Sequence, residues 1–194
     1  TRDINIGEII SVEQPYACVL TTDKLSHCYY CLELCYNTIP CDHCTVALYC
    51  SDFCKVKAYA TYHKYECSIL ASLCDLAKNN TLLLALKITL LALDDYYRAY
   101  INGLDDNDCY QSDRYKEVQR LKTATARSIR TEVLHKAIQT AIVFELLSRQ
   151  TNFFNCFGED AKRKFKELMF LHLEITSSNA VKIYEYTHNS NFSE

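Results

Sequence analysis

Residues 28–67 read CYYCLELCYNTIPCDHCTVALYCSDFCKVKAYATYHKYEC and decide how this chain folds. Seven cysteines and one histidine in this stretch form four pairs of candidate metal ligands. The pairs are Cys28-x2-Cys31, Cys41-x2-Cys44, Cys50-x3-Cys54 and His63-x3-Cys67. A two-residue gap lets both thiolates of one turn reach the same ion, and a three-residue gap places both ligands on one face of a helix. Four such pairs supply the eight ligands of two tetrahedral zinc sites.

A helix expected at the end of this stretch restricts how the pairs combine. Ser51 suits a helix N-cap, and residues 52–67 contain no Gly or Pro, so Cys54, His63 and Cys67 are expected on one helix. Cys54 and His63 would then lie on opposite faces, roughly 13 Å apart along the axis. They cannot share a metal whose ligands lie at about 2.0–2.3 Å. The third pair therefore serves one zinc and the fourth pair the other, while the geometry leaves crossed and nested pairings open.

The ligands and the residues around them resemble the MYND zinc finger. The match includes all eight ligands, Leu48-Tyr49-Cys50-Ser51, Ala58 and the run Tyr62-His63-Lys64-Tyr65-Glu66-Cys67. Tyr59 stands where that family often has Trp, so an aromatic residue is kept. The family pairing is crossed. The resemblance thus assigns Cys28, Cys31, Cys50 and Cys54 to one zinc and Cys41, Cys44, His63 and Cys67 to the other.

Three other interpretations of the cysteines are weaker. A secreted disulfide scaffold would also concentrate cysteines, but a long cysteine-poor region follows here and His63 stands at ligand spacing. Thiol exchange by a redox-active Cys-x2-Cys motif does not need four coordinated pairs, so the redox interpretation is less favoured. His43 could replace a cysteine as ligand, but its neighbours already fill the site, which favours a solvent-facing turn residue.

Length and charge restrict the function classes. The 194 residues can bury one good core or two small ones, and a chain that opens on Thr1 is expected to be part of a longer protein. The formal charge of −3 becomes about −6 once seven zinc-bound thiolates and two zinc ions are counted, which disfavours direct nucleic-acid binding. No apolar run reaches the roughly twenty residues of a membrane span. Thiols kept for zinc indicate the cytoplasm or the nucleus.

The first twenty residues are expected to form strands. Ile4, Ile6, Ile9, Ile10 and Val12 are β-branched, while Gly7 interrupts the run and Pro15 limits the second strand. The segment from Arg2 to Ile10, followed by Glu13-Gln14-Pro15-Tyr16, resembles the opening of a SET domain. A MYND finger directly after it is similar to the arrangement in SET-and-MYND lysine methyltransferases, where the finger is inserted into a split SET domain.

The region after residue 67 is expected to be almost wholly helical. We predict helices over 68–77 and from about 81 to 102, the latter buried on most sides because residues 82–93 are nearly all apolar. The acidic loop 104–113 lacks the glycine and glutamate of a calcium loop. Two later helices carry apolar stripes that should face the core. These are Leu134, Ala137, Ile138, Ala141 and Ile142, then Phe165, Leu168, Met169, His172 and Leu173. His172 has no second ligand nearby and is expected to be a packed, hydrogen-bonded histidine.

The last stretch, 179–184, has a β-like composition. In the resembled family, a strand containing an asparagine re-enters the SET core here and helps to line the pocket for S-adenosylmethionine, which makes Asn179 the candidate cofactor-binding residue. A surface strand is an equally good interpretation. The family's glycine-rich turn would precede Thr1, and its catalytic elements would follow Glu194, so no catalytic residue is assigned in this chain.

The sequence thus predicts an α+β protein with four segments. Residues 1–24 are N-terminal SET strands, 28–67 a two-zinc MYND finger, 68–176 a mainly helical SET insert and 177–194 the start of the SET core. The resemblance implies a fragment of a protein-lysine methyltransferase, with S-adenosylmethionine and the lysine substrate bound only by the full-length protein. The finger would bind another protein or a proline-containing peptide, at a surface that the resemblance assigns to Tyr59, Tyr62 and neighbouring apolar groups. The alternative is a non-catalytic zinc-finger scaffold or transcriptional regulator.

Overall fold

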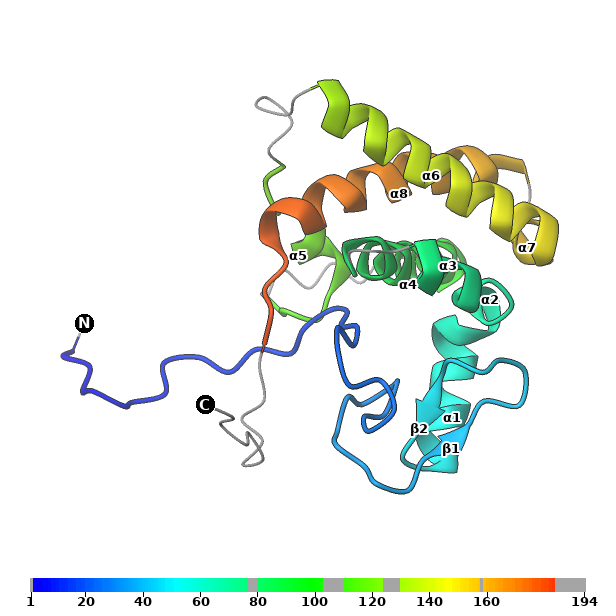
Figure 1. The fold of residues 1–194 in the computed structure, drawn as a ribbon. Helices are drawn as coiled ribbons and strands as arrows, with labels where there is room; N and C mark the ends of the chain where they lie inside the picture. The colour runs from blue at the N-terminus through cyan, green and yellow to red at the C-terminus, as the bar shows by residue number, and fades with distance from the viewer. Residues whose placement is uncertain (1, 77–79, 103–109, 124–129, 158, 184–194) are drawn as a thin grey trace.

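A computed structural model describes residues 2–76, 80–102, 110–123, 130–157 and 159–183, which form a mostly helical molecule with one two-stranded sheet (Figure 1). Most of the acidic loop, residues 104–109, falls outside the described residues. The elements in chain order are β1 (Ile39–Pro40), β2 (Leu48–Tyr49), α1 (Asp52–Ala58), the π-helical turn η1 (Tyr59–His63), α2 (Lys64–Glu66), α3 (Leu70–Leu76), α4 (Thr81–Asn102), α5 (Tyr115–Gln119), α6 (Arg130–Gln150), α7 (Phe153–Phe157) and α8 (Glu159–Asn179). No helix in the described ranges is long and apolar enough to cross a membrane.

The sheet belongs to the cysteine-rich segment, which adjoins the helices. Strands β1 and β2 pair antiparallel, with Ile39 opposite Tyr49 and Pro40 opposite Leu48. Helix α1 follows directly, and η1 contacts α4. Figure 1 shows α4 between this segment and the layer formed by α6 and α8. The cysteine-rich segment therefore contacts the helical region through η1, near the C-terminal end of the segment.

The N-terminal segment differs from the expected strands. The described residues 2–24 form no strand, and Gly7, with φ of +86°, lies in a turn in which Glu8 N–H donates to Asn5 O at 3.1 Å. Ile6, Ile9 and Ile10 are exposed. Figure 1 shows the first part of the segment extending away from the folded body, whereas Tyr16, Ala17 and Val19 further along pack against the core. A β-branched sequence forms a strand only when a neighbouring backbone accepts its ladder of hydrogen bonds, and no other described segment pairs with this one.

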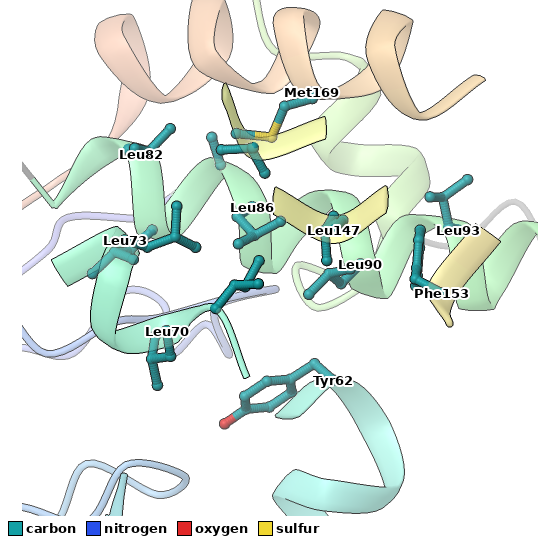
Figure 2. Close-up of a cluster of buried hydrophobic side chains, with 14 of the residues drawn as sticks. Tyr62, Leu70, Leu73, Leu82, Leu86, Leu90, Leu93, Leu147, Phe153 and Met169 are labelled. Atoms are coloured by element: carbon teal, nitrogen blue, oxygen red, sulfur yellow. The ribbon is translucent and has the colours of Figure 1, made fainter. Parts of the chain in front are cut away.

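Helix α4 forms the centre of the helical region, as its apolar sequence predicted. Its side chains from 82 to 93 are buried on nearly all sides, Lys87 and Thr89 included. Helices α4 and α8 pack together, and α6 packs on α8. Figure 2 shows the side chains that meet there, which are Leu82, Leu86, Leu90 and Leu93 of α4, Leu70 and Leu73 of α3, Leu147 of α6, Phe153 of α7 and Met169 of α8. This burial supplies the main apolar stabilisation of the chain.

The stripe predicted for α6 is wrong. Leu134 is 60% exposed, Ile138 49% and Ile142 37%, whereas Val143 and Leu147 are fully buried. The predicted row (Leu134, Ile138 and Ile142) and the buried row (Val143 and Leu147) both have helical spacing and apolar residues. Periodicity could therefore not decide which row faces the core. The choice is made by α8, which packs on the 143–147 row.

The stripe predicted for α8 is confirmed. Phe165, Met169 and Leu173 are at most 3% exposed, and Phe165 stacks edge-on with Phe153 at 5.9 Å between ring centroids. His172 is fully buried. Its Nδ1 lies 2.8 Å from Thr89 Oγ1 and its Nε2 lies 3.0 Å from the Tyr115 hydroxyl. His172 is thus the packed, hydrogen-bonded histidine that the sequence indicated.

Candidate metal centres

The first metal-ligand cluster consists of four thiols. The Sγ atoms of Cys28, Cys31, Cys50 and Cys54 all lie within 4.8 Å of one another. Two of the separations are 3.7 Å, between Cys31 and Cys50, and 3.5 Å, between Cys50 and Cys54. In a tetrahedral site with Zn–S bonds of about 2.3 Å the sulfurs are about 3.8 Å apart. The cluster therefore has the size of a four-thiolate zinc site.

The N-terminus of α1 positions one side of this cluster. Ser51 is extended, and its Oγ accepts a hydrogen bond from Cys54 N–H at 3.3 Å, as expected for an N-cap. The cap starts the helix between the two ligands of the third pair. Cys50 and Cys54 are thereby brought to one end of α1, where the partial positive charge of the helix favours thiolates.

The second cluster combines three thiols and an imidazole. His63 Nε2 lies 3.3 Å from Cys41 Sγ and 3.5 Å from Cys44 Sγ, and the Sγ atoms of Cys41 and Cys67 are 3.8 Å apart. A tetrahedral site with one nitrogen and three sulfur ligands has N–S edges of about 3.5 Å and S–S edges of about 3.8 Å. The four groups thus fit a zinc ion through His63 Nε2.

The grouping of the two clusters is the crossed one. The first and third pairs share one cluster, and the second and fourth pairs share the other. The sulfur separations of 3.5–3.8 Å exclude disulfide bonds, in which the sulfurs are about 2.05 Å apart. The helical stretch between the third and fourth pairs is not one uniform α-helix, because the π turn η1 interrupts it. This turn inserts a residue and changes the direction in which His63 faces relative to Cys54.

Each cluster contains one thiol that ionises readily. Burial alone would raise the pKa of Cys28, but backbone N–H groups of Cys31, Cys50 and Tyr30 lower it to about 7. At the second cluster, burial is likewise outweighed by hydrogen bonds from His43 N–H and His63, so that the pKa of Cys41 is about 7. Burial raises the pKa of Cys31 to about 12 and that of Cys67 still further. The clusters therefore release protons when a cation binds, which makes metal affinity pH-dependent.

One more cysteine lies beside the first cluster. Burial and the negative charges of Cys28 and Cys50 raise the pKa of Cys35, which places its thiol near theirs. It lies outside the four-ligand group. It was missed from the sequence because Cys31, which precedes it by a three-residue gap, was already paired with Cys28.

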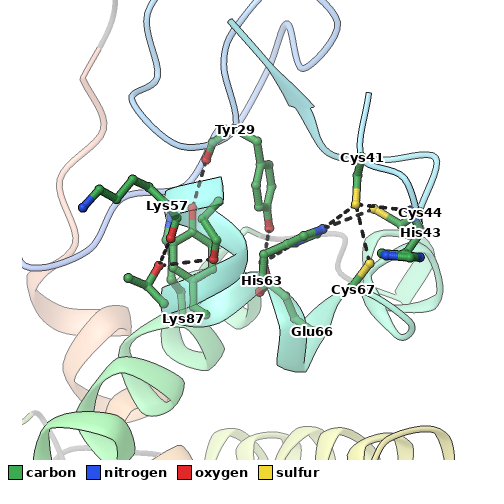
Figure 3. A network of polar contacts seen from close by, with 12 residues as sticks. Tyr29, Cys41, His43, Cys44, Lys57, His63, Glu66, Cys67 and Lys87 are labelled. Atoms are coloured by element: carbon green, nitrogen blue, oxygen red, sulfur yellow. Dashed lines mark hydrogen bonds and ion pairs between the residues drawn. The ribbon is translucent and has the colours of Figure 1, made fainter. Parts of the chain in front are cut away.

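The second cluster is backed by a buried polar network. Glu66 Oε1 accepts a hydrogen bond from the Tyr29 hydroxyl at 2.8 Å and lies 3.4 Å from His63 Nδ1 (Figure 3). The Tyr49 hydroxyl is buried with no hydrogen-bond partner in the described part of the chain. Burial and the charges of Cys41, Cys44, Glu66 and Cys67 raise the Tyr49 pKa, which places the ring close to the ligands.

The surface of α1 and of the first residue of η1 carries an exposed apolar row. Phe53 and Val56 are each 65% exposed and Tyr59 is 45% exposed, at a spacing of three residues that places them along one side of the helix. The Tyr59 ring lies 6.0 Å from that of His43. Tyr62, by contrast, is 3% exposed and faces inward, so it cannot contribute to the peptide-binding surface that the sequence assigned to it with Tyr59.

Asn179 lies on a helix and not on a strand. It is the last residue of α8, and its Nδ2 donates to Lys122 O and to Ile175 O, each at 2.9 Å. Residues 180–183 follow without regular structure, and 184 lies outside the described residues. Helix α8 thus extends to Asn179, where the β-like composition of 179–184 had predicted a strand. The role of Asn179 in cofactor binding stays a prediction.

The chain is similar to proteins named protein-lysine N-methyltransferase SMYD4. The human protein is 31% identical over 43% of this chain and 13% of its own length, and the mouse protein is 32% identical over 43% and 14%. The zebrafish protein is 26% identical over 71% of this chain and 24% of its own length. No family model matches the chain. The chain thus spans a quarter or less of the length of these relatives, and their similarity confirms the resemblance to SET-and-MYND methyltransferases.

Proposed function

We propose that this chain is the two-zinc finger and adjoining helical region of a protein-lysine methyltransferase, in which the finger binds other proteins. The observation that carries the proposal is the pair of clusters, each with four ligand atoms within 4.8 Å of one another. Zinc in such sites supplies structural cross-links and takes no part in a reaction. The similarity to SMYD4 proteins supports the wider assignment.

Methyl transfer belongs to the whole protein in this proposal. The chain spans only 13–24% of its relatives, and a methyltransferase needs a bound donor and positioned reactive groups. We therefore assign S-adenosylmethionine and the substrate lysine to the full-length protein and expect the 194-residue chain to be inactive alone. Methyl transfer by the isolated chain to any lysine peptide would refute this part of the proposal.

The finger surface formed by Phe53, Val56 and Tyr59 is the proposed protein-binding site. A proline-containing peptide in the polyproline II conformation docks onto exposed aromatic rings, because it loses little conformational entropy on binding. Tyr59 and its neighbour His43 provide such rings beside the second cluster. The competing role is a finger that only braces the fold, which the contact between η1 and α4 also supports.

A peptide titration separates these two roles. Proline-containing peptides are added to the 15N-labelled, zinc-loaded chain while the backbone resonances are followed. Binding should shift resonances of residues 53–59 and should be lost in Tyr59→Ala but kept in Tyr110→Ala, which removes an exposed tyrosine outside the finger. If no finger resonance shifts, the finger is a brace.

The alternative whole-protein function is a scaffold or transcriptional regulator without catalysis. It is tested by incubating the full-length protein with labelled S-adenosylmethionine and a mixture of lysine-containing proteins. Incorporation of label above that of a reaction without the protein supports the enzyme. Absence of label, with the peptide binding retained, supports the scaffold.

A further inference from the structure

A carboxylate is buried directly behind the second metal cluster. The Glu66 side chain is 2% exposed, and the His63 side chain beside it is 1% exposed. Burying a carboxylate is costly unless hydrogen-bond donors surround it. Two donors face Glu66 Oε1, the Tyr29 hydroxyl at 2.8 Å and His63 Nδ1 at 3.4 Å. Glu66 Oε1 thus faces the metal ligand His63.

The two nitrogens of His63 face different partners. Nε2 lies among the thiols of Cys41 and Cys44, and Nδ1 faces Glu66. A histidine that ligates through Nε2 must carry its ring proton on Nδ1, and that N–H needs an acceptor when it is buried. A carboxylate there fixes the tautomer and the ring orientation and strengthens the imidazole as a ligand.

The same network reaches helix α4 through two tyrosine rings. Lys87 of α4 is 6% exposed, and its Nζ lies 4.1 Å from the centroid of the Tyr62 ring and 5.6 Å from that of Tyr29. The Tyr62 hydroxyl donates to Tyr29 O at 3.3 Å, and the Tyr29 ring packs edge-on against His63. Lys87 Nζ also donates to Cys18 O at 2.8 Å. Figure 3 shows Cys41, His63, Glu66, Tyr29 and Lys87 as they lie in this set of contacts.

We infer that Glu66 is a positioning residue of the second zinc site, and that Tyr29, Tyr62 and Lys87 couple occupancy of that site to docking of the finger on α4. The inference rests on the proposed zinc binding and adds residues that are not ligands. A metal on Nε2 holds the His63 ring, which supports the position of Tyr29. Tyr29 and Tyr62 present the faces that stabilise the buried ammonium. Metal binding and docking therefore stabilise each other, as linkage requires.

The role of Glu66 is tested by zinc affinity. Glu66→Gln keeps the shape of the side chain and removes its charge, and Asp75→Asn makes the same charge change on the exposed side of α3. Competition with a chromophoric chelator should show one of the two zinc ions bound about 10- to 100-fold more weakly in Glu66→Gln and neither changed in Asp75→Asn. Cobalt spectra assign the weakened site, since four-thiolate and three-thiolate sites absorb differently.

The outcomes separate the inference from the proposed function. Two zinc ions bound to Glu66→Gln as tightly as to the wild type would overturn the role of Glu66 while leaving the zinc sites intact. Fewer than two zinc ions in the wild type would instead overturn the proposed function. Imidazole 15N spectra give a second test, because His63 in the zinc-loaded wild type should carry its proton on Nδ1.

The coupling to α4 is tested with Lys87→Met and with Lys166→Met as the matched control. Lys166 also lies over an aromatic ring, that of Phe144 at 4.0 Å, but on the exposed side of α8. Lys87→Met should weaken the second zinc and not the first, and Lys166→Met should weaken neither. In the wild type, partial removal of zinc with a chelator should speed hydrogen exchange in residues 82–93 as the second site empties. Unchanged exchange in 82–93, or unchanged zinc affinity in a folded Lys87→Met, would overturn the coupling.

Discussion

Acid should destabilise this protein through His172, and the structure sets the size of the effect. Thr89 Oγ1 donates to Ala85 O at 2.7 Å, so it accepts from His172 Nδ1–H. Tyr115 donates its hydroxyl proton to Nε2. Both nitrogens are thus satisfied in the neutral imidazole, and protonation of Nε2 would oppose the Tyr115 donor. Burial lowers the pKa of His172 to about 4.

The direction of the pH dependence follows from the pKa of His172 in the unfolded and folded states. In the unfolded chain the pKa of His172 is about 6.5, so between pH 6.5 and 4 the unfolded state binds more protons than the folded state. The free energy of unfolding therefore falls as the pH decreases through this window, by up to about 1.4 kcal/mol per pH unit. The total loss is about 3 kcal/mol, of which about 2 kcal/mol has occurred at pH 5. Above pH 7 this histidine contributes no pH dependence.

The assay compares urea unfolding of the wild type and of His172→Gln, at pH 7.5 and pH 5 with excess zinc. Glutamine keeps hydrogen-bonding groups on α8 but does not titrate. Zinc release at low pH affects both proteins alike, so it cancels in the difference between them. The advantage of the wild type over His172→Gln should shrink by about 2 kcal/mol between the two pH values. Equal losses in both proteins would refute the reasoning.

Two further predictions concern α6. Leu147→Ala should cost about 2–5 kcal/mol in the free energy of unfolding because it empties a fully buried site. Ile138→Ala should cost less than about 0.5 kcal/mol because nearly half of that side chain is exposed. Equal costs in urea unfolding would contradict the observed orientation of α6. Lys136→Met should cost about 3–5 kcal/mol because it removes the ammonium that lies 2.7 Å from the buried Glu174 carboxylate. Lys136→Met combined with Glu174→Leu should recover most of the loss, so a double variant no more stable than Lys136→Met would count against the ion pair.

Local spacing was enough to predict the residues that form the two possible metal-binding clusters. The two- and three-residue gaps fix which side chains share a turn, and the distance between Cys54 and His63 separates the third pair from the fourth. The crossed grouping came from the family resemblance, because the loops that join the pairs impose no order. The network of Glu66, Tyr29 and Lys87 could not be predicted, since it joins residues 37 positions apart within the finger and others on α4.

The wrong predictions about the fold have one common cause. Composition does not specify which neighbouring segment a strand or helix packs against. Ile9 and Ile10 have strand propensity, but no described strand lies beside them, and the backbone of 2–24 stays irregular. Helix α6 has apolar residues on two sides, and only the position of α8 decides that Leu147 is buried and Leu134 is not. The α4 and α8 predictions succeeded because α4 is apolar all round and α8 has a single apolar face.

The central claim is that eight side chains of residues 28–67 bind two structural zinc ions. Native mass spectrometry combined with elemental analysis of the purified chain measures this directly. We expect two zinc ions per chain, one of them lost in Cys31→Ser and the other in Cys44→Ser, and loss of the folded finger when a strong chelator removes both. One zinc ion per chain, none, or an unchanged finger after complete removal of zinc would contradict this claim.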